Sequence, residues 1–165
     1  MDLHNKIVTD ANIFYMGLPF LTTAEYTYYI TPQIFDEIKH IKKNIDGLDF
    51  LMITRKVIMI QASDEIISQV KKKETEVGKI LLSHADRSII ALALQLNLPI
   101  LSTDFSLVNI AKHLSLKVVT PGKKNFTLRI ARKYCSICRK SSTNNSDFCE
   151  NCGNRLVIKR SKSQA

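Results

Sequence analysis

The sequence predicts an α/β domain with a mostly parallel central sheet, followed by a small cysteine-containing ribbon. Up to residue 121, short apolar segments rich in β-branched residues alternate with amphipathic helical segments. This alternation is typical of a parallel sheet with helices on both faces. All four cysteines of the 165-residue chain lie after residue 121, in two closely spaced pairs. One ordinary domain with a small unit attached is therefore expected.

The first predicted strand contains Ile7 and Val8, and Asp10 follows where that strand ends, with Asn12 close behind. Open α/β sheets place ligand groups at the carboxyl ends of their strands, and a carboxylate there can hold a hard cation. Alternatively, Asp10 caps a helix that begins near Asn12. Residues 13 to 29 predict only an irregular or partly strand-like connection.

A helix is predicted to begin at Pro32, because proline suits the first helical turn and Thr31 is a good N-cap. Ile34 and Ile38 lie on its apolar face. Glu37 lies beside both isoleucines in helical projection. It either borders the buried face or is an ordinary solvated residue of the helix.

The middle of the chain predicts a short helix over 48–53, a buried strand over 57–60 and an amphipathic helix over 63–77. Ser83 and Asp86 then have the spacing of a capping box at the start of a strongly apolar helix. Asp86 therefore bonds back to Ser83, faces a cleft, or does both, because one carboxylate oxygen can face each way.

A further buried strand is predicted over 98–102, with Asp104 just past its end. A helix over 107–114 and a last strand over 116–120 follow. Loops at the carboxyl ends of parallel strands gather at one rim. Asp10 and Asp104 come from two such loops, so the topology permits them to converge with the acidic residues of the two helices.

The charge of the chain is distributed unevenly. Residues 1–121 carry 13 Lys+Arg and 13 Asp+Glu, whereas residues 122–165 carry 11 Lys+Arg against 2 Asp+Glu, which accounts for the whole net charge of +9. Such an asymmetry indicates a polyanionic partner, most simply nucleic acid, although a solvated basic tail has the same composition. The candidate RNA-binding residues are Lys123, Lys124, Arg129, Arg132, Lys133, Arg139 and Lys140.

Cys135-x-x-Cys138 and Cys149-x-x-Cys152 are separated by ten residues. Paired CxxC knuckles are typical of a tetrahedral zinc site, and a closed four-cysteine site is structural, not catalytic. The alternative, a pair of disulfides, requires an oxidising compartment. We therefore expect one structural Zn²⁺ that stabilises a segment too small to have its own core.

The composition of the chain and the length of its apolar runs argue against a membrane protein. Apolar residues make up 45% of the chain, which is enough for a globular core. The longest uncharged run, Ser88 to Thr103, is interrupted by Asn97 and Pro99 and is too polar to span a bilayer. No secretory signal is visible. We expect a cytoplasmic protein.

Asp10-x-Asn12, Glu37 after Thr31-Pro32, Ala85-Asp86 and Ser102-x-Asp104 together resemble the PIN nuclease domain over roughly residues 5–120. With the four-cysteine ribbon, the chain resembles the Nin-one-binding branch of that family, in its compact archaeal form. The closer likeness lies in Thr31-Pro-x-x-x-x-Glu-Ile-Lys39, Leu82-Ser-x-Ala-Asp86 and Val108-Asn-Ile-Ala111.

The resemblance implies a Rossmann-like fold and an endoribonuclease that matures the 3′ end of small-subunit rRNA. Its partners would be the precursor rRNA and the pre-ribosomal small subunit. The boundaries we expect are 1–121 for the PIN domain, 122–133 for a basic linker, 134–160 for the zinc ribbon and 161–165 for a tail. Alternatives are a non-catalytic rRNA-binding assembly factor, a toxin-type PIN ribonuclease and a ribbon-containing transcription factor.

The same resemblance assigns roles to the acidic residues. Carboxylates in one cleft repel one another and need a cation, and oxygen ligands suit Mg²⁺ or Mn²⁺. The implied metal ligands are Asp10, Asp86 and Asp104, with Glu37 as a ligand or water-orienting base. The implied supporting residues are Asn12, Ser102 and Thr103, the last of which occupies a position where some relatives carry a further acid.

Overall fold

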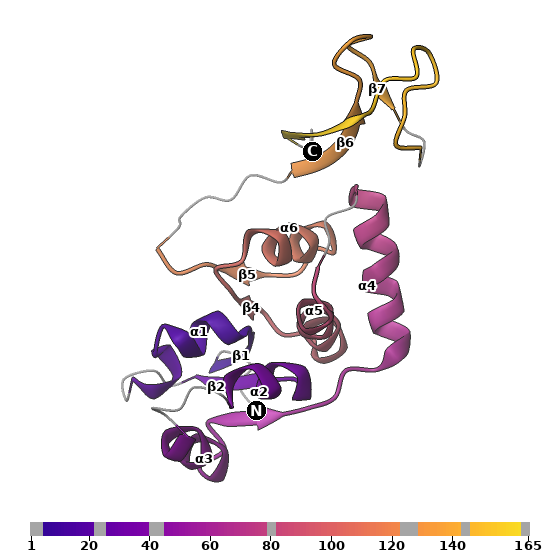
Figure 1. Ribbon diagram of the computed structural model, residues 1–165. Helices are drawn as coiled ribbons and strands as arrows, with labels where there is room; N and C mark the ends of the chain where they lie inside the picture. Colours follow the sequence, from indigo (N-terminus) through magenta and orange to yellow (C-terminus); the bar gives the residue numbers. More distant parts are fainter. Residues whose placement is uncertain are drawn as a thin grey trace.

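A five-stranded sheet forms the centre of the larger domain (Figure 1), in the order β3-β2-β1-β4-β5. The computed structural model describes residues 5–21, 26–39, 45–78, 82–122, 129–142 and 146–162. All neighbouring strands of this sheet are parallel, which confirms the predicted fold class. The strands are β1 (Lys6–Thr9), β2 (Thr27–Ile30), β3 (Val57–Met59), β4 (Ile100–Leu101) and β5 (Val118–Val119).

Strand β2 is the main departure from the predicted elements, because it lies in the segment whose pattern was unclear. It pairs with β1 on one side and β3 on the other, and Tyr28 and Ile30 are buried. A strand buried on both faces does not alternate between apolar and polar residues. The Thr/Tyr-rich sequence therefore carries β-propensity without the period that identifies a strand.

The helices follow the prediction more closely. Thr31 and Ser63 are the N-caps of α2 and α4, and each accepts a hydrogen bond from a backbone N–H three residues later. The helices are α1 (Ala11–Tyr15), α2 (Pro32–Ile38), α3 (Ile45–Ile53), α4 (Asp64–Val77), α5 (His84–Leu96) and α6 (Phe105–His113), with a short 3₁₀ helix η2 (Leu18–Phe20).

Helix α5 is the centre of the packing. It contacts β1 and β4 of the sheet as well as α2, α4 and α6 (Figure 1). Ile89, Ile90 and Leu92 of α5 are fully buried, together with Val8 of β1 and Ile100 of β4. Because α5 begins with the capping box, this packing holds Asp86 at a defined place beside the sheet.

The C-terminal region forms a separate antiparallel sheet in the order β7-β6-β8. Its strands are β6 (Arg129–Tyr134), β7 (Ser141–Ser142) and β8 (Val157–Lys162). Strand β6 begins inside the segment 122–133 that we expected to be a linker. It forms there because β8 pairs with it along its whole length, from Arg129 opposite Lys162 to Tyr134 opposite Val157. Within the described ranges, no helix has the length and apolarity to cross a membrane.

Candidate active site

Asp10 lies between the end of β1 and the start of α1, and its side chain is only 3% exposed. Its Oδ1 accepts a hydrogen bond from the Ile13 N–H at 3.2 Å, so the predicted capping role is present. Its Oδ2 accepts a hydrogen bond from the hydroxyl of Ser102, at the end of β4. Asp10 thus caps a helix and also stands at the carboxyl edge of the sheet.

Ser102 connects two of the predicted acidic residues. It is fully buried, and its single hydroxyl donates to Asp10 while it accepts from the backbone N–H of Asp104 at 3.0 Å. Asp104 in turn caps α6, because its Oδ1 accepts from the Leu107 N–H at 2.8 Å. The supporting role predicted for Ser102 therefore has a direct geometric basis.

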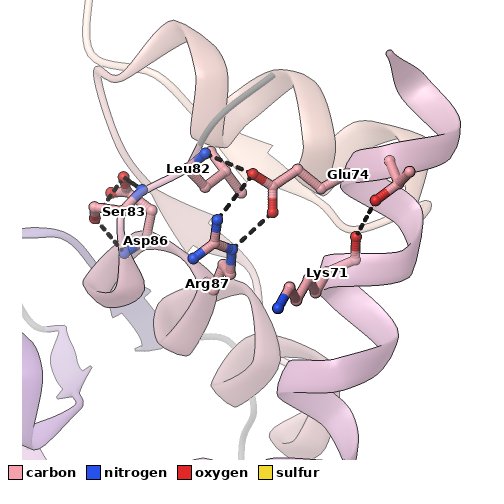
Figure 2. Close-up of polar contacts among 7 residues, drawn as sticks. Lys71, Glu74, Leu82, Ser83, Asp86 and Arg87 are labelled. Carbon is pink, nitrogen blue, oxygen red and sulfur yellow. Dashed lines mark hydrogen bonds and ion pairs between the residues drawn. The ribbon is translucent and has the colours of Figure 1, made fainter. Parts of the chain in front are cut away.

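Asp86 forms the capping box that its spacing predicts (Figure 2). Its Oδ2 accepts from the N–H of Ser83 at 3.0 Å and from the Ser83 hydroxyl at 2.8 Å. The Asp86 N–H donates back to the Ser83 hydroxyl at 3.0 Å. Among the described residues, Oδ2 receives both hydrogen bonds of this carboxylate, which leaves Oδ1 for another ligand.

A buried hydroxyl chain joins the helix of Glu37 to the helix of Asp86. The Ser88 hydroxyl donates to the carbonyl oxygen of Ala85 at 2.7 Å, so the Thr31 hydroxyl is the donor of the 2.7 Å bond between these two side chains. Thr31 also caps α2, the helix that carries Glu37. Because Thr31 and Ser88 are fully buried, α2 and α5 are held in fixed register.

The four carboxylates influence one another electrostatically. Burial raises the pKa of Asp10 above its ordinary value of 3.8, and the charges of Asp104 and Asp86 raise it further. The Ser102 hydroxyl and the Ile13 N–H oppose this shift of the pKa by stabilising the carboxylate. Partial burial, and then the charge of Asp86, also raise the pKa of Glu37.

Such mutual effects require that these residues lie close together. Asp10 therefore lies within range of the charges of Asp86 and Asp104, and Glu37 within range of that of Asp86, and their assembly into one metal-binding rim stays a prediction. Oxygen donors are of the kind that suits Mg²⁺ or Mn²⁺, but among the described residues it is the four cysteines whose ligand atoms already lie close enough together to hold a metal ion. Asn12 is exposed and Thr103 half-buried near the same strand ends, and their supporting roles stay predictions.

Two charged residues near this rim were not singled out by the sequence. Glu74 of α4 is 5% exposed, and Arg87 of α5 binds it through two nitrogen atoms, Nε at 2.7 Å and Nη2 at 3.1 Å. This contact raises the pKa of the Arg87 guanidinium. Glu74 stands among lysines in sequence, and only its helical spacing to the buried Val70 and Val77 indicates that it faces inward.

The four cysteines form the most compact ligand set in the described part of the chain, because their Sγ atoms all lie within 4.8 Å of one another. Two of the Sγ–Sγ distances are 3.5 Å, from Cys135 to Cys152, and 3.9 Å, from Cys138 to Cys149. Four thiolates about 2.3 Å from a tetrahedral Zn²⁺ are about 3.8 Å apart, whereas disulfide sulfurs are about 2 Å apart. The thiols are free, which contradicts the disulfide alternative.

The basic residues of the ribbon differ in how accessible they are. Arg132, Arg139 and Lys140 are exposed. Lys133 is engaged within the ribbon, where its ammonium group binds the Asp147 carboxylate and the carbonyl oxygen of Ser146. The side chains of Lys123, Lys124 and Arg129 lie outside the described part of the structure.

A model of the PIN domain of ribonuclease matches residues 7–96 of the chain. Endoribonuclease Nob1 from Pyrococcus abyssi is 31% identical over 99% of this chain and 100% of that protein. Endoribonuclease Nob1 from Methanocaldococcus jannaschii is 32% identical over 95% of this chain and 79% of that protein. Ribonuclease VapC1 from Thermoplasma acidophilum is 30% identical over 56% of this chain and 48% of that protein.

The chain therefore belongs to the PIN-domain ribonucleases. Within that family it is an endoribonuclease of the Nob1 type, because the similarity to Nob1 extends over nearly the whole chain and includes the cysteine ribbon.

Proposed function

We propose that this endoribonuclease matures the 3′ end of small-subunit rRNA by metal-dependent hydrolysis at the rim formed by Asp10, Glu37, Asp86 and Asp104. The observation that supports the proposal is the buried Asp10, which the Ser102 hydroxyl binds at the carboxyl ends of β1 and β4 and links to the backbone N–H of Asp104. Four acids gathered at the carboxyl edge of a parallel sheet are stable together when a cation neutralises them.

Asp10, Asp86 and Asp104 are the residues that would hold Mg²⁺ or Mn²⁺. Helix caps already fix the orientation of the three carboxylates, so binding a cation costs little further ordering. A carboxylate oxygen has two lone pairs, so a capping bond does not prevent it from binding a cation. When bound, such a cation lowers the pKa of the attacking water and stabilises the charge that develops on the phosphodiester.

Glu37 has a different role because it is exposed at the end of α2. Its raised pKa, caused by partial burial and by Asp86, makes it a better proton acceptor than an ordinary glutamate. Glu37 therefore orients the attacking water and takes its proton. The expected products carry a 5′-phosphate and a 3′-hydroxyl.

The ribbon is the part that holds the rRNA, with one structural Zn²⁺ bound by Cys135, Cys138, Cys149 and Cys152. Exposed Arg132, Arg139 and Lys140 can neutralise phosphates. Phe148 is 58% exposed and free to stack on a base, whereas Tyr134 has the Lys159 ammonium group over its ring, 4.8 Å from the centroid.

The test is cleavage of a small-subunit rRNA 3′-end precursor fragment in Mg²⁺ or Mn²⁺, with Asp10→Asn as the control. The proposal expects cleavage at a restricted site, and its loss in the Asn variant while the circular dichroism spectrum is unchanged. Tight, salt-sensitive binding of the fragment by the wild type without cleavage, in the isolated protein and in pre-ribosomal small subunits, would favour an assembly factor instead.

A further inference from the structure

Glu74 is a buried carboxylate that the proposed chemistry does not use. It is 5% exposed, and Asp10 is the other buried acid among the described residues. Its Oε1 accepts from the Leu82 N–H at 2.7 Å and from Nη2 of Arg87 at 3.1 Å, while its Oε2 accepts from Nε of Arg87 at 2.7 Å. Figure 2 shows this carboxylate reaching from α4 to both residues. Every oxygen of Glu74 is thus used to hold α5 and the residue before its cap.

The two residues that Glu74 binds flank the capping box. Leu82 directly precedes Ser83, and Arg87 directly follows Asp86. Ser83 in turn holds the Oδ2 atom of Asp86 through its N–H and its hydroxyl. The orientation of the Asp86 side chain therefore depends on a short segment, residues 82–87. Glu74 of α4 binds both ends of this segment.

Stability alone is a weak reason for such a contact. Moving a charged pair into a protein interior costs solvation energy that the attraction between the charges often only balances. The bidentate geometry of an arginine–carboxylate pair instead gives directional precision. By contrast, Lys73 and Glu76 on the same helix form an exposed ion pair at 2.9 Å through a single nitrogen atom, which fixes no orientation.

From this geometry we infer that Glu74 and Arg87 are positioning residues for Asp86: they hold the Ser83–Asp86 cap so that the remaining carboxylate oxygen points into the metal-binding rim. The inference rests on the proposed function of that rim. In this inference both residues act through Asp86, because the groups they bind lie directly before Ser83 and directly after Asp86. Partners that orient a metal ligand typically contribute about 10–100-fold to metal affinity.

The experiment measures Mn²⁺ binding directly, by the electron paramagnetic resonance signal of free Mn²⁺, in zinc-loaded full-length protein. Glu74→Gln removes the charge while keeping the volume, and Arg87→Lys keeps the charge while losing the two-pronged contact. Glu76→Gln is the matched control, because it breaks an exposed pair on the same helix. All measurements use a temperature at which each variant keeps the wild-type helical signal.

We expect Glu74→Gln to weaken Mn²⁺ binding about 10-fold, Arg87→Lys to weaken it by less, and Glu76→Gln to leave it unchanged. Both substitutions are also made in an Asp86→Asn background. There Glu74→Gln should have no further effect on Mn²⁺ binding, because the group through which it acts is absent.

Three results would overturn the inference. Wild-type Mn²⁺ affinity in Glu74→Gln would show that the pair has no part in positioning, whatever its effect on stability. An equal loss of affinity with and without the Asp86 carboxylate would show that Glu74 acts generally on the fold. If the wild-type protein binds no Mn²⁺, the proposed metal site does not exist. That outcome refutes the proposed function, whereas the first two outcomes refute only the positioning role of Glu74.

Discussion

Replacing Ser102 with alanine tests the link between the two strand ends that carry Asp10 and Asp104. The Ser102 side chain is fully buried and makes two hydrogen bonds, one to the Asp10 carboxylate and one from the Asp104 N–H. A bond to a charged group contributes about 1.5–3 kcal/mol and a neutral one about 0.5–1.5 kcal/mol. If both bonds are lost, the free energy of unfolding is expected to fall by about 2–4.5 kcal/mol.

The size of this loss depends on pH. Burial raises the pKa of Asp10 in the folded state, so its protonated form favours folding. This contribution is fully present below the ordinary pKa of 3.8 and is lost as the pH rises through the raised folded-state value. Because the Ser102 hydroxyl lowers the pKa of Asp10, Ser102→Ala raises that pKa further. The destabilisation therefore grows with pH between the two folded-state pKa values.

The assay is urea unfolding followed by the helical circular dichroism signal, with zinc retained and no Mg²⁺ or Mn²⁺ added. This signal reports the larger domain, because the described helices lie between residues 11 and 113. Ser68→Ala is the matched control, since its hydroxyl is exposed and its bond within the described segments is to the carbonyl oxygen of Asp64 on its own helix. A loss below about 0.5 kcal/mol, no larger than that of an ordinary surface substitution, would refute the role assigned to Ser102.

Three further predictions concern the metal, the proton acceptor and the RNA. Cys135→Ser should abolish zinc binding, measured by atomic absorption, while the helical signal persists; retained stoichiometric zinc would contradict the four-cysteine site. Glu37→Gln should lower the single-turnover cleavage rate about 10²-fold. It should also abolish the increase of this rate with pH that the raised pKa of Glu37 predicts for the wild type. A variant with the wild-type rate and pH dependence would exclude Glu37 as the proton acceptor. Arg132→Ala combined with Lys140→Ala should reduce the slope of log affinity against log salt by about 2 for an rRNA fragment; an unchanged slope would place the RNA elsewhere.

Local sequence patterns predicted much of the fold because they depend on neighbours in the chain. Thr31 was identified as a helix cap from Pro32 directly after it, and Ser83 from Asp86 three positions later, and both make the expected bonds. The cysteine pairs predicted a four-sulfur cluster for the same reason, since each knuckle is a local turn. Strand β2 was predicted only as part of an irregular or partly strand-like connection, because its burial on both faces depends on β1 and β3, which are remote in sequence.

By itself the sequence determined which acids are present, that Asp86 belongs to a capping box and which cysteines form a ligand set. Only the tertiary structure decided how these groups meet. Asp10 and Ser102 are 92 positions apart and meet because β1 and β4 are adjacent in the sheet. Glu74, in a lysine-rich stretch, was buried by the packing of α4 on α5. The physical reason is that capping is a short-range effect, whereas burial, and with it the pKa of a carboxylate, depends on what distant segments place around it.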